Sequence, residues 1–208
     1  MGEDAAWAGG KLVHKNVLDK VNAKIEKGAL AVVNALVLHQ TGGSSATSSL
    51  SSYDQGQNGA HFLIDKDGTI YQTARVDQKC WHVGHIRSRC QEMKVCEKED
   101  LKAIQALLFK KGESYAVRIG NVSQHESGKA YPARYPTNED SLGVEIVGAF
   151  DSKADAYEAV TREQNGALAW LVDQLARKFG LDDDDVYRHG GIGYKQPSEA
   201  STAQWKSP

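Results

Sequence analysis

Long apolar runs are missing from this 208-residue sequence, and no stretch approaches the roughly 18 consecutive apolar residues of a membrane-spanning helix. The sequence also has no marked excess of either charge, because 25 Lys and Arg are balanced by 27 Asp and Glu. No basic cluster is denser than Lys110 and Lys111, which argues against a nucleic-acid partner. Residues 1–10 lack the basic start and apolar core of a secretory signal. We therefore expect no membrane span, no nucleic-acid substrate and no Sec signal.

Cysteine is scarce, and the three that occur follow no common pattern. Cys80, Cys90 and Cys96 fit neither an evenly paired disulfide framework nor the CxxC spacing of a zinc site. Cys90 and Cys96 either close a small loop in an oxidising compartment or remain ordinary thiols. The spacing leaves both alternatives open.

The length and composition are those of a globular protein. Apolar residues make up 40% of the chain, and a chain of this size buries enough surface to fold without metal or disulfide staples. We predict a single domain over residues 1–208, with an N-terminal extension at 1–29 and an insertion at 86–130. Any metal would then serve chemistry rather than folding.

Short apolar or β-branched runs bounded by turn residues predict strands, at residues 31–39, 61–64, 69–72, 142–147 and 186–189. Asp67-Gly68 lies between the second and third runs and predicts a tight hairpin with both residues at positive φ. The first run ends at His39 and the last at His189.

Helical spacing of apolar residues predicts three helices, at residues 12–25, 100–111 and 161–179. The last has a capping box from Thr161 to Gln164 and a stop at Gly180. The serine-rich residues 44–52 predict a short helix or a loop. Together these elements predict an α/β fold with a central mixed sheet flanked by helices.

The two histidines at strand ends are candidate metal ligands. A catalytic zinc needs three protein ligands and one open position for water. A histidine at a strand end is, however, more often a hydrogen-bonded structural residue. His39 and His189 alone do not decide between these interpretations.

Five segments give the decisive pattern, in this order: LVLHQT with His39, GAHFLIDKDGTIYQ, CWHVG with Trp81 and His82, NEDSLGVEIVG with Glu145, and VYRHGGIGYKQPSEASTAQW with His189. In this order they resemble the zinc-dependent N-acetylmuramoyl-L-alanine amidases of the peptidoglycan-recognition-protein superfamily, the type 2 amidases. The resemblance spans about residues 33–205, with gaps in the serine-rich segment and across 86–130.

The resemblance implies a role for each matched residue. His39 and His189 would be zinc ligands in a surface groove at the strand ends, and Glu145 would be the catalytic carboxylate. Trp81 and His82 would line the substrate groove, and His82 has a structural, hydrogen-bonded role as an equal alternative.

One position suggests which branch of the family the sequence resembles. Ala60 stands where some members carry a catalytic tyrosine, so the sequence looks like the branch that uses a glutamate instead. His61, the next residue, is then expected to point into the fold.

The end of the chain departs from the family pattern. Members typically place a lysine and, two residues later, an aspartate or cysteine ligand after the second histidine, but here Lys195 is followed by Pro197. Glu199 is the only carboxylate after His189 and is our candidate third ligand. Lys195 is our candidate oxyanion stabiliser.

The function that the resemblance implies is zinc-dependent cleavage of the amide between N-acetylmuramic acid and L-alanine in peptidoglycan. We expect a monomer acting on peptidoglycan or muropeptides, with an inhibitor or immunity protein as a further candidate partner. Without a Sec signal it would be cytoplasmic in its producer, or delivered to the periplasm or cell wall by another route as an effector or lytic enzyme. Two alternatives stay open: a non-catalytic peptidoglycan-binding module, and a cytoplasmic amidase that recycles anhydro-muropeptides.

Overall fold

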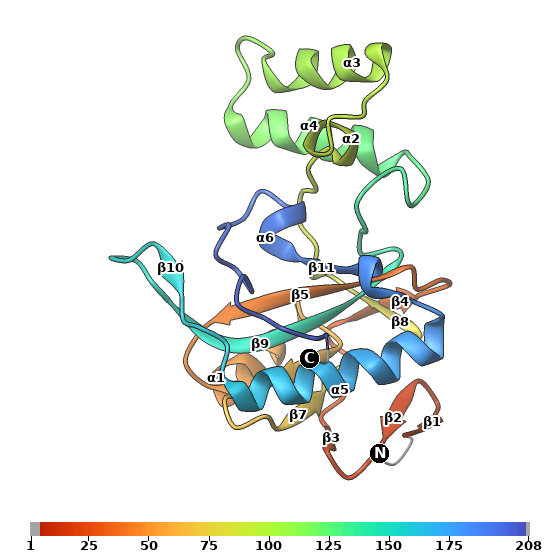
Figure 1. The fold of residues 1–208 in the computed structure, drawn as a ribbon, viewed down its shortest axis with the longest axis vertical. Coiled ribbons are helices and arrows are strands. Elements are labelled where there is room, and N and C mark those ends of the chain that lie inside the picture. The colour runs from red at the N-terminus through yellow and green to blue at the C-terminus, as the bar shows by residue number, and fades with distance from the viewer. Residues whose placement is uncertain (1–4, 207–208) are drawn as a thin grey trace.

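The computed structural model describes residues 5–206, and a mixed β-sheet lies at its centre (Figure 1). The strand order is β11-β5-β9-β6-β7-β3, with β10 added to β9. These strands are β3 (Val17–Asp19), β5 (Ala35–Gly42), β6 (Phe62–Ile64), β7 (Ile70–Gln72), β9 (Ser141–Asp151), β10 (Ala156–Tyr157) and β11 (Val186–Arg188). Adjacent strands are parallel except in the pairs β6–β7 and β9–β10. The predicted α/β fold with a central mixed sheet is confirmed.

The two faces of the sheet have different partners because side chains alternate along each strand. One face forms the main core with the helix α5 (Arg162–Phe179), through Leu36, Leu38, Phe62, Ile64, Leu142, Val144 and Ile146. On the other face, Leu63 and Val147 pack with Ala46 of the helix α1 (Ala46–Tyr53). The run LVLH in β5 is buried on both faces, which explains its nearly continuous apolar character.

The helix α5 follows the predicted pattern closely. Thr161 and Gln164 form the capping box, and Gly180 ends the helix in the left-handed conformation with φ of 70°. Leu168, Leu171 and Leu175 are fully buried against the sheet. The cap is also hydrogen-bonded to the sheet, because the side-chain amide of Gln164 donates to the carbonyl of Val147 at 2.8 Å.

Two strand predictions need correction in detail. Strand β5 begins at Ala35 and continues to Gly42, so His39 lies inside the strand rather than at its end. In the β6–β7 hairpin only Gly68 has positive φ, at 86°. Its N–H donates to the carbonyl of Asp65, which makes a longer loop than the predicted two-residue turn.

The predicted helix over residues 12–25 is wrong. Within this range the chain forms the end of β2 (Lys11–Val13) and the strand β3. The strands β1 (Ala6–Ala8) and β4 (Glu26–Ala29) lie on either side, and β4 pairs with β8 (Gln78–Cys80). Val17 pairs with Ile70 at the edge of the central sheet, so the backbone bonds to β7 instead of to itself. Of the three residues at helical spacing, Val17, Val21 and Ile25, only Ile25 is fully buried.

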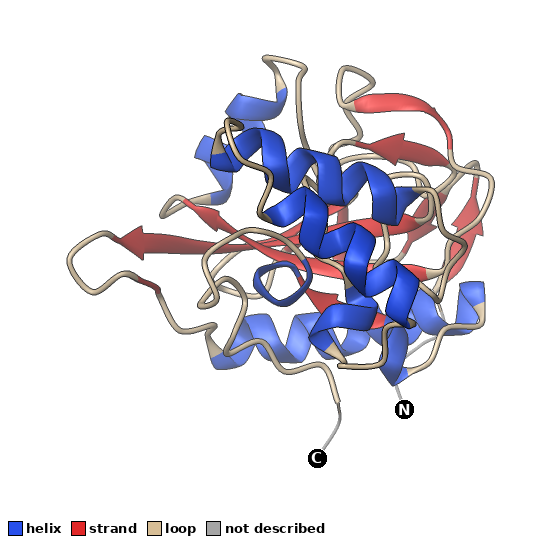
Figure 2. Ribbon diagram, turned by 90° about the horizontal axis from the view of Figure 1, so that it is seen from above, coloured by secondary structure: helices blue, strands red, loops and turns tan. Residues whose placement is uncertain are grey.

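Residues 86–130 form a helical arm that projects from one end of the sheet (Figure 1). It contains α2 (Arg89–Glu92), α3 (Lys98–Leu108) and α4 (Tyr115–Ser127), which Figure 2 shows in front of the strands. The sequence predicts α3 but misses α4, in which only Val122 is a fully buried apolar residue. A disulfide joins Cys90 to Cys96 within the arm, while Cys80 is a buried free thiol.

No helix within residues 5–206 is long and apolar enough to cross a bilayer.

The first prediction concerns the cap of α5. Thr161→Ala should lower the free energy of unfolding by about 1–2 kcal/mol, because the first turn of α5 loses its side-chain acceptor and Lys66 loses the bond from the threonine hydroxyl. Urea denaturation measures the change. Thr161→Ser keeps the cap oxygen and should stay within about 0.5 kcal/mol of the parent. Equal losses in the two variants would contradict this role for the cap.

Candidate active site

The site is built on the register between the two central strands β5 and β9. His39 pairs with Glu145 in the parallel ladder, and paired residues project to the same face of a sheet. That face is turned away from α5. It is bordered by the end of α1 and by the loops that contain Trp81 and Glu199. The ladder therefore places the first histidine beside the predicted catalytic carboxylate.

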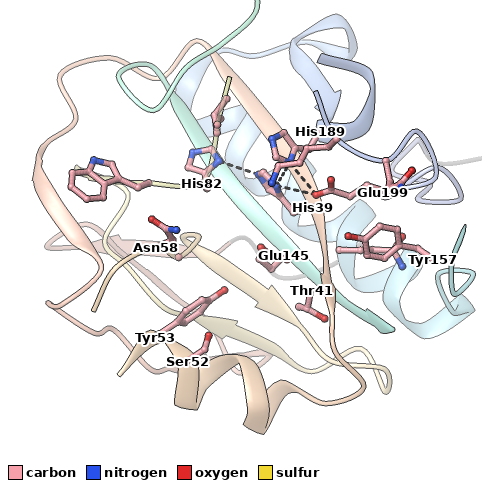
Figure 3. Close-up of a pocket in the computed structure, with 17 residues that line it drawn as sticks. His39, Thr41, Ser52, Tyr53, Asn58, His82, Glu145, Tyr157, His189 and Glu199 are labelled. Carbon is pink, nitrogen blue, oxygen red and sulfur yellow. Dashed lines mark hydrogen bonds and ion pairs between the residues drawn. The ribbon is translucent and has the colours of Figure 1, made fainter. Parts of the chain in front are cut away.

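The structure brings three predicted metal ligands together. His189 begins the one-turn helix α6 (His189–Ile192) directly after β11, which is the parallel neighbour of β5. The Nδ1 atoms of His39 and His189 lie 3.0 Å apart, and Oε1 of Glu199 lies 3.4 Å from the first and 3.0 Å from the second. Figure 3 shows the three side chains turned toward one another. All three residues are buried.

This triangle fits a tetrahedral metal ion. Zinc bonds to histidine nitrogen and carboxylate oxygen are about 2.0–2.2 Å, which puts neighbouring ligand atoms about 3.3–3.5 Å apart. Two histidines and one carboxylate are also a known ligand set for catalytic zinc. The carboxylate can accept a hydrogen bond from each imidazole. Both Nδ1 atoms would then carry a proton, although the two nitrogen atoms lie only 3.0 Å apart. A shared cation resolves this contact.

The protonation states of the triangle also suit a metal. Burial, followed by the charge of His189, lowers the pKa of His39 to about 4. Burial alone would raise the pKa of Glu199, but hydrogen bonds from His189 and His39 hold it at about 2. At neutral pH His39 is thus neutral and Glu199 is ionised, as metal binding requires.

His82 lies directly behind His39. Its Nδ1 is 3.1 Å from Nε2 of His39, and its Nε2 is 3.3 Å from the carbonyl oxygen of Ser141. Metal-binding histidines commonly donate their second ring N–H to such a partner, which fixes the ring orientation. The absent side chain of Gly143 makes room for this ring, since a Cβ there would lie 2.8 Å from His82. His82 is therefore hydrogen-bonded to the site and also forms part of the pocket wall.

Glu145 faces the same space without a partner. Its Oε2 is buried and makes no hydrogen bond within the described part of the chain. Burial, followed by the charge of Glu199, raises the pKa of Glu145 to about 8, although Lys195 opposes the shift. A carboxyl group with a pKa near neutrality can both accept and return a proton, which is what general acid–base catalysis needs.

These residues line a pocket of about 500 Å³ (Figure 3). Trp81 and Lys195 contribute to its wall as the sequence predicts, and both are solvent-exposed. Further lining residues were not predicted: Thr41, Ser52, Tyr53, Asn58 and Tyr157. Thr41 follows His39 by two residues, so strand alternation could have found it; the others have no such signal.

The last loop reaches the site despite its departure from the family pattern. A Cβ on Gly190 would lie 2.4 Å from the carbonyl oxygen of Gln196, so this glycine lets the loop fold tightly over α6. The turn after Pro197 then carries Glu199 to the two histidines. The longer spacing still places one carboxylate beside the two histidines, at the position expected for a third ligand.

Ala60 and His61 lie in the interior, on the segment that enters β6. Both are fully buried. Nδ1 of His61 accepts from the N–H of Gly143, and its Nε2 donates to the carbonyl of Gln78. The side chain of His61 therefore points into the fold, as expected.

Comparison with known proteins decides the family. Residues 29–203 match the sequence profile of the N-acetylmuramoyl-L-alanine amidases. The chain belongs to this family. The predicted resemblance is confirmed, and with it the enzyme class: the chain is a peptidoglycan amidase. No curated protein matches the amidase significantly in sequence.

Solved structures show the same fold at low sequence identity. The amidase resembles AmpD with a TM-score of 0.60 and 14% identity, covering 97% of this chain and 94% of that one. The N-acetylmuramoyl-L-alanine amidase LysC from Clostridium intestinale gives a TM-score of 0.51 and 18% identity, with coverage of 86% and 85%. PGRP-SA of Apis mellifera gives a TM-score of 0.51 and 14% identity, with coverage of 91% of this chain and 92% of that one.

The second prediction follows from the pKa of Glu145, which is about 8 in the folded protein against an ordinary value of 4.5 for a glutamate side chain. Between these values the folded protein keeps a proton that the unfolded chain has released, so the free energy of unfolding falls as pH rises. With metal removed by chelator, Glu145→Gln should be about 1–3 kcal/mol more stable than the parent at pH 8. Near pH 4.5 the gain should largely disappear. Urea denaturation at both pH values measures it.

The matched control is Glu139→Gln, which changes a glutamate whose side chain is 69% exposed. This variant should show no comparable gain at pH 8. If Glu145→Gln were no more stable than the parent at pH 8, the carboxyl would be ionised in the fold at little cost.

Proposed function

We propose that the amidase uses zinc held by His39, His189 and Glu199 to cleave the amide between the lactoyl group of N-acetylmuramic acid and L-alanine. The observation that supports this is the buried triangle of two imidazole nitrogens and one carboxylate oxygen beside the unpartnered carboxyl of Glu145. When bound, zinc would polarise the scissile carbonyl and make water acidic enough to attack near neutral pH.

Glu145 is the proposed general base. Its carboxylate takes one proton from the attacking water while the new C–O bond forms at the scissile carbon. It then returns that proton to the nitrogen of L-alanine as the C–N bond breaks, which leaves the lactoyl carboxylic acid, still carrying the second proton of the water, and a free amine. Transfer by one positioned group of this kind contributes about 10²- to 10⁴-fold.

Lys195 is the proposed stabiliser of the developing oxyanion. Its ammonium lies close enough to the site to lower the pKa values of His39 and Glu145. A positive charge at this position favours the tetrahedral transition state over the neutral amide. Trp81, 49% exposed at the pocket wall, is a proposed contact surface for substrate.

The disulfide in the arm favours one site of action. Cys90–Cys96 would persist in the periplasm or outside the cell and would be kept reduced in most cytosols. We therefore infer action on the cell wall, in preference to cytoplasmic recycling of anhydro-muropeptides.

The third prediction tests the metal ligands. The purified amidase should contain about one zinc per chain, and His39→Ala or His189→Ala should lose it. Glu199→Ala should bind zinc more weakly, and its turnover should partly recover as zinc is added, because mass action compensates for a lost ligand. Metal analysis and equilibrium dialysis measure both effects.

His14→Ala is the control, since His14 stacks on Trp170 away from the pocket, and it should keep its zinc. Full zinc occupancy in His39→Ala would refute the ligand assignment.

The fourth prediction tests the general base. Glu145→Gln should keep the fold and the zinc but lose about 10²- to 10⁴-fold in turnover, because an amide cannot accept the proton. Mass spectrometry of products released from peptidoglycan measures it. Added zinc should not restore activity, in contrast to Glu199→Ala. Full activity in Glu145→Gln would assign the proton transfer to another group.

A further inference from the structure

The helical arm carries most of the exposed apolar side chains of the protein. Nine large apolar side chains are exposed within residues 5–206, and five of them belong to the arm: Met93, Val95, Phe109, Tyr115 and Val117. Phe109 is the most exposed of the nine, at 72%. A single exposed apolar side chain is ordinary, but a concentration of them on one projecting element indicates an interaction surface.

Phe109 lies where the chain turns from α3 into α4. Residues 109–117, which we call the tip, form this connection and the first turn of α4, and the connection lies away from the sheet in Figure 1. Every residue of the tip is exposed except Glu113. The side chain of Arg118 donates to the carbonyl of Leu108 at 3.0 Å, so it bonds the start of α4 to the end of α3. The tip is therefore an exposed turn held between two packed helices.

The arm is positively charged, in contrast to the rest of the chain. Residues 86–130 contain nine Lys and Arg against six Asp and Glu, whereas all other residues contain 16 against 21. The exposed pair Lys110 and Lys111 directly follows Phe109. Lys110 is paired with Glu113 at 2.6 Å, while Lys111 has no ion-pair partner in the described part of the chain. The tip thus presents an exposed aromatic ring beside an uncompensated positive charge.

The tip is also fixed relative to the rest of the protein. Tyr115 packs edge-on against Tyr194 at 6.4 Å between ring centres. Just before the arm begins, the carbonyl of His85 accepts a hydrogen bond from the N–H of Tyr194. These contacts join the arm to the loop that follows His189. A surface that binds the tip would therefore orient the whole protein.

These features suit the surface of an anionic bilayer better than a folded protein partner. A stable protein interface buries about 800 Å² on each side and is depleted in lysine. The tip instead offers a few separate apolar side chains on a projecting turn, with lysines beside them. Aromatic rings favour the headgroup region of a bilayer, and anionic headgroups attract nearby lysines. Neither effect requires a partner of matching shape.

We propose that the tip of the arm docks on the surface of an anionic lipid bilayer. The ring of Phe109 enters the headgroup region, and Lys110 and Lys111 lie against the lipid phosphates. The contact is peripheral, since no helix within residues 5–206 can span a bilayer. Docking uses none of the residues assigned to zinc binding or proton transfer, so it is independent of the proposed function.

Co-sedimentation with lipid vesicles tests this contact. The full chain should bind vesicles that contain about 30% phosphatidylglycerol at least about tenfold more tightly than vesicles of phosphatidylcholine alone. The difference should shrink as the salt concentration rises. Phe109→Ser should weaken binding to the anionic vesicles about fivefold, because the ring no longer enters the headgroup region. Lys111→Gln should weaken it about fivefold through the loss of one charge. Both variants should cleave a soluble muropeptide at the parent's rate.

Two matched controls lie outside the arm. Lys153→Gln removes the same charge from an exposed turn after β9, so it changes the net charge of the protein as Lys111→Gln does. Val32→Ser removes an apolar side chain that is 49% exposed. Both control variants should bind the anionic vesicles as tightly as the parent.

Three results would overturn the inference. One is a parent protein that binds neither kind of vesicle, or both equally. A second is an equal loss of binding in Lys153→Gln and Lys111→Gln, which would assign the attraction to the whole protein instead of the tip. The third is a parent that ignores vesicles but forms a dimer in sedimentation velocity runs, with the dimer lost in Phe109→Ser; the tip would then be an interface between two copies of the chain. Cleavage of muropeptides is measured separately, so none of these results bears on the proposed function.

Discussion

The parallel pairing of β5 with β9 is the constraint on which the site depends. It aligns His39 with Glu145, while Leu36 and Leu38 enter the core against α5. A slip of one residue would turn His39 toward α5 and a leucine toward the cleft, which would cost both the core and the site. Burial of apolar side chains on one face thus keeps the catalytic groups in place on the other.

The predictable parts of the molecule are those in which local signals and tertiary structure agree. Thr161, Gln164 and Gly180 end α5 through local bonds, and the apolar run of β5 is buried on both faces, so both elements are visible in the sequence. In residues 12–25 the local signal and the tertiary structure disagree. Val17 and Val21 have helical spacing, but the backbone of β3 forms hydrogen bonds to β7. The helix α4 is missed because it buries little apolar surface of its own.

The residues of the candidate site also differ in how far local signals in the sequence predict their positions. His39, Glu145 and His189 lie in or directly after strands, where a motif fixes their positions. Glu199 lies in a loop whose path depends on the tight contact between Gly190 and Gln196, which spacing alone does not reveal. The edge-on contact between Tyr115 of α4 and Tyr194 joins two segments that are far apart in the chain, and no local pattern in the sequence connects them.

The burial of Cys80 affects whether the disulfide in the arm can exchange with a thiol of the same chain. Burial raises the pKa of the Cys80 thiol to about 12, so almost none of it is thiolate at neutral pH. Thiol–disulfide exchange needs an accessible thiolate as the attacking group. Once the sheet has formed, Cys80 cannot attack the Cys90–Cys96 bond, although the chain has an odd number of cysteines. The folded protein therefore protects its single cross-link from internal rearrangement and leaves it open only to external reductants.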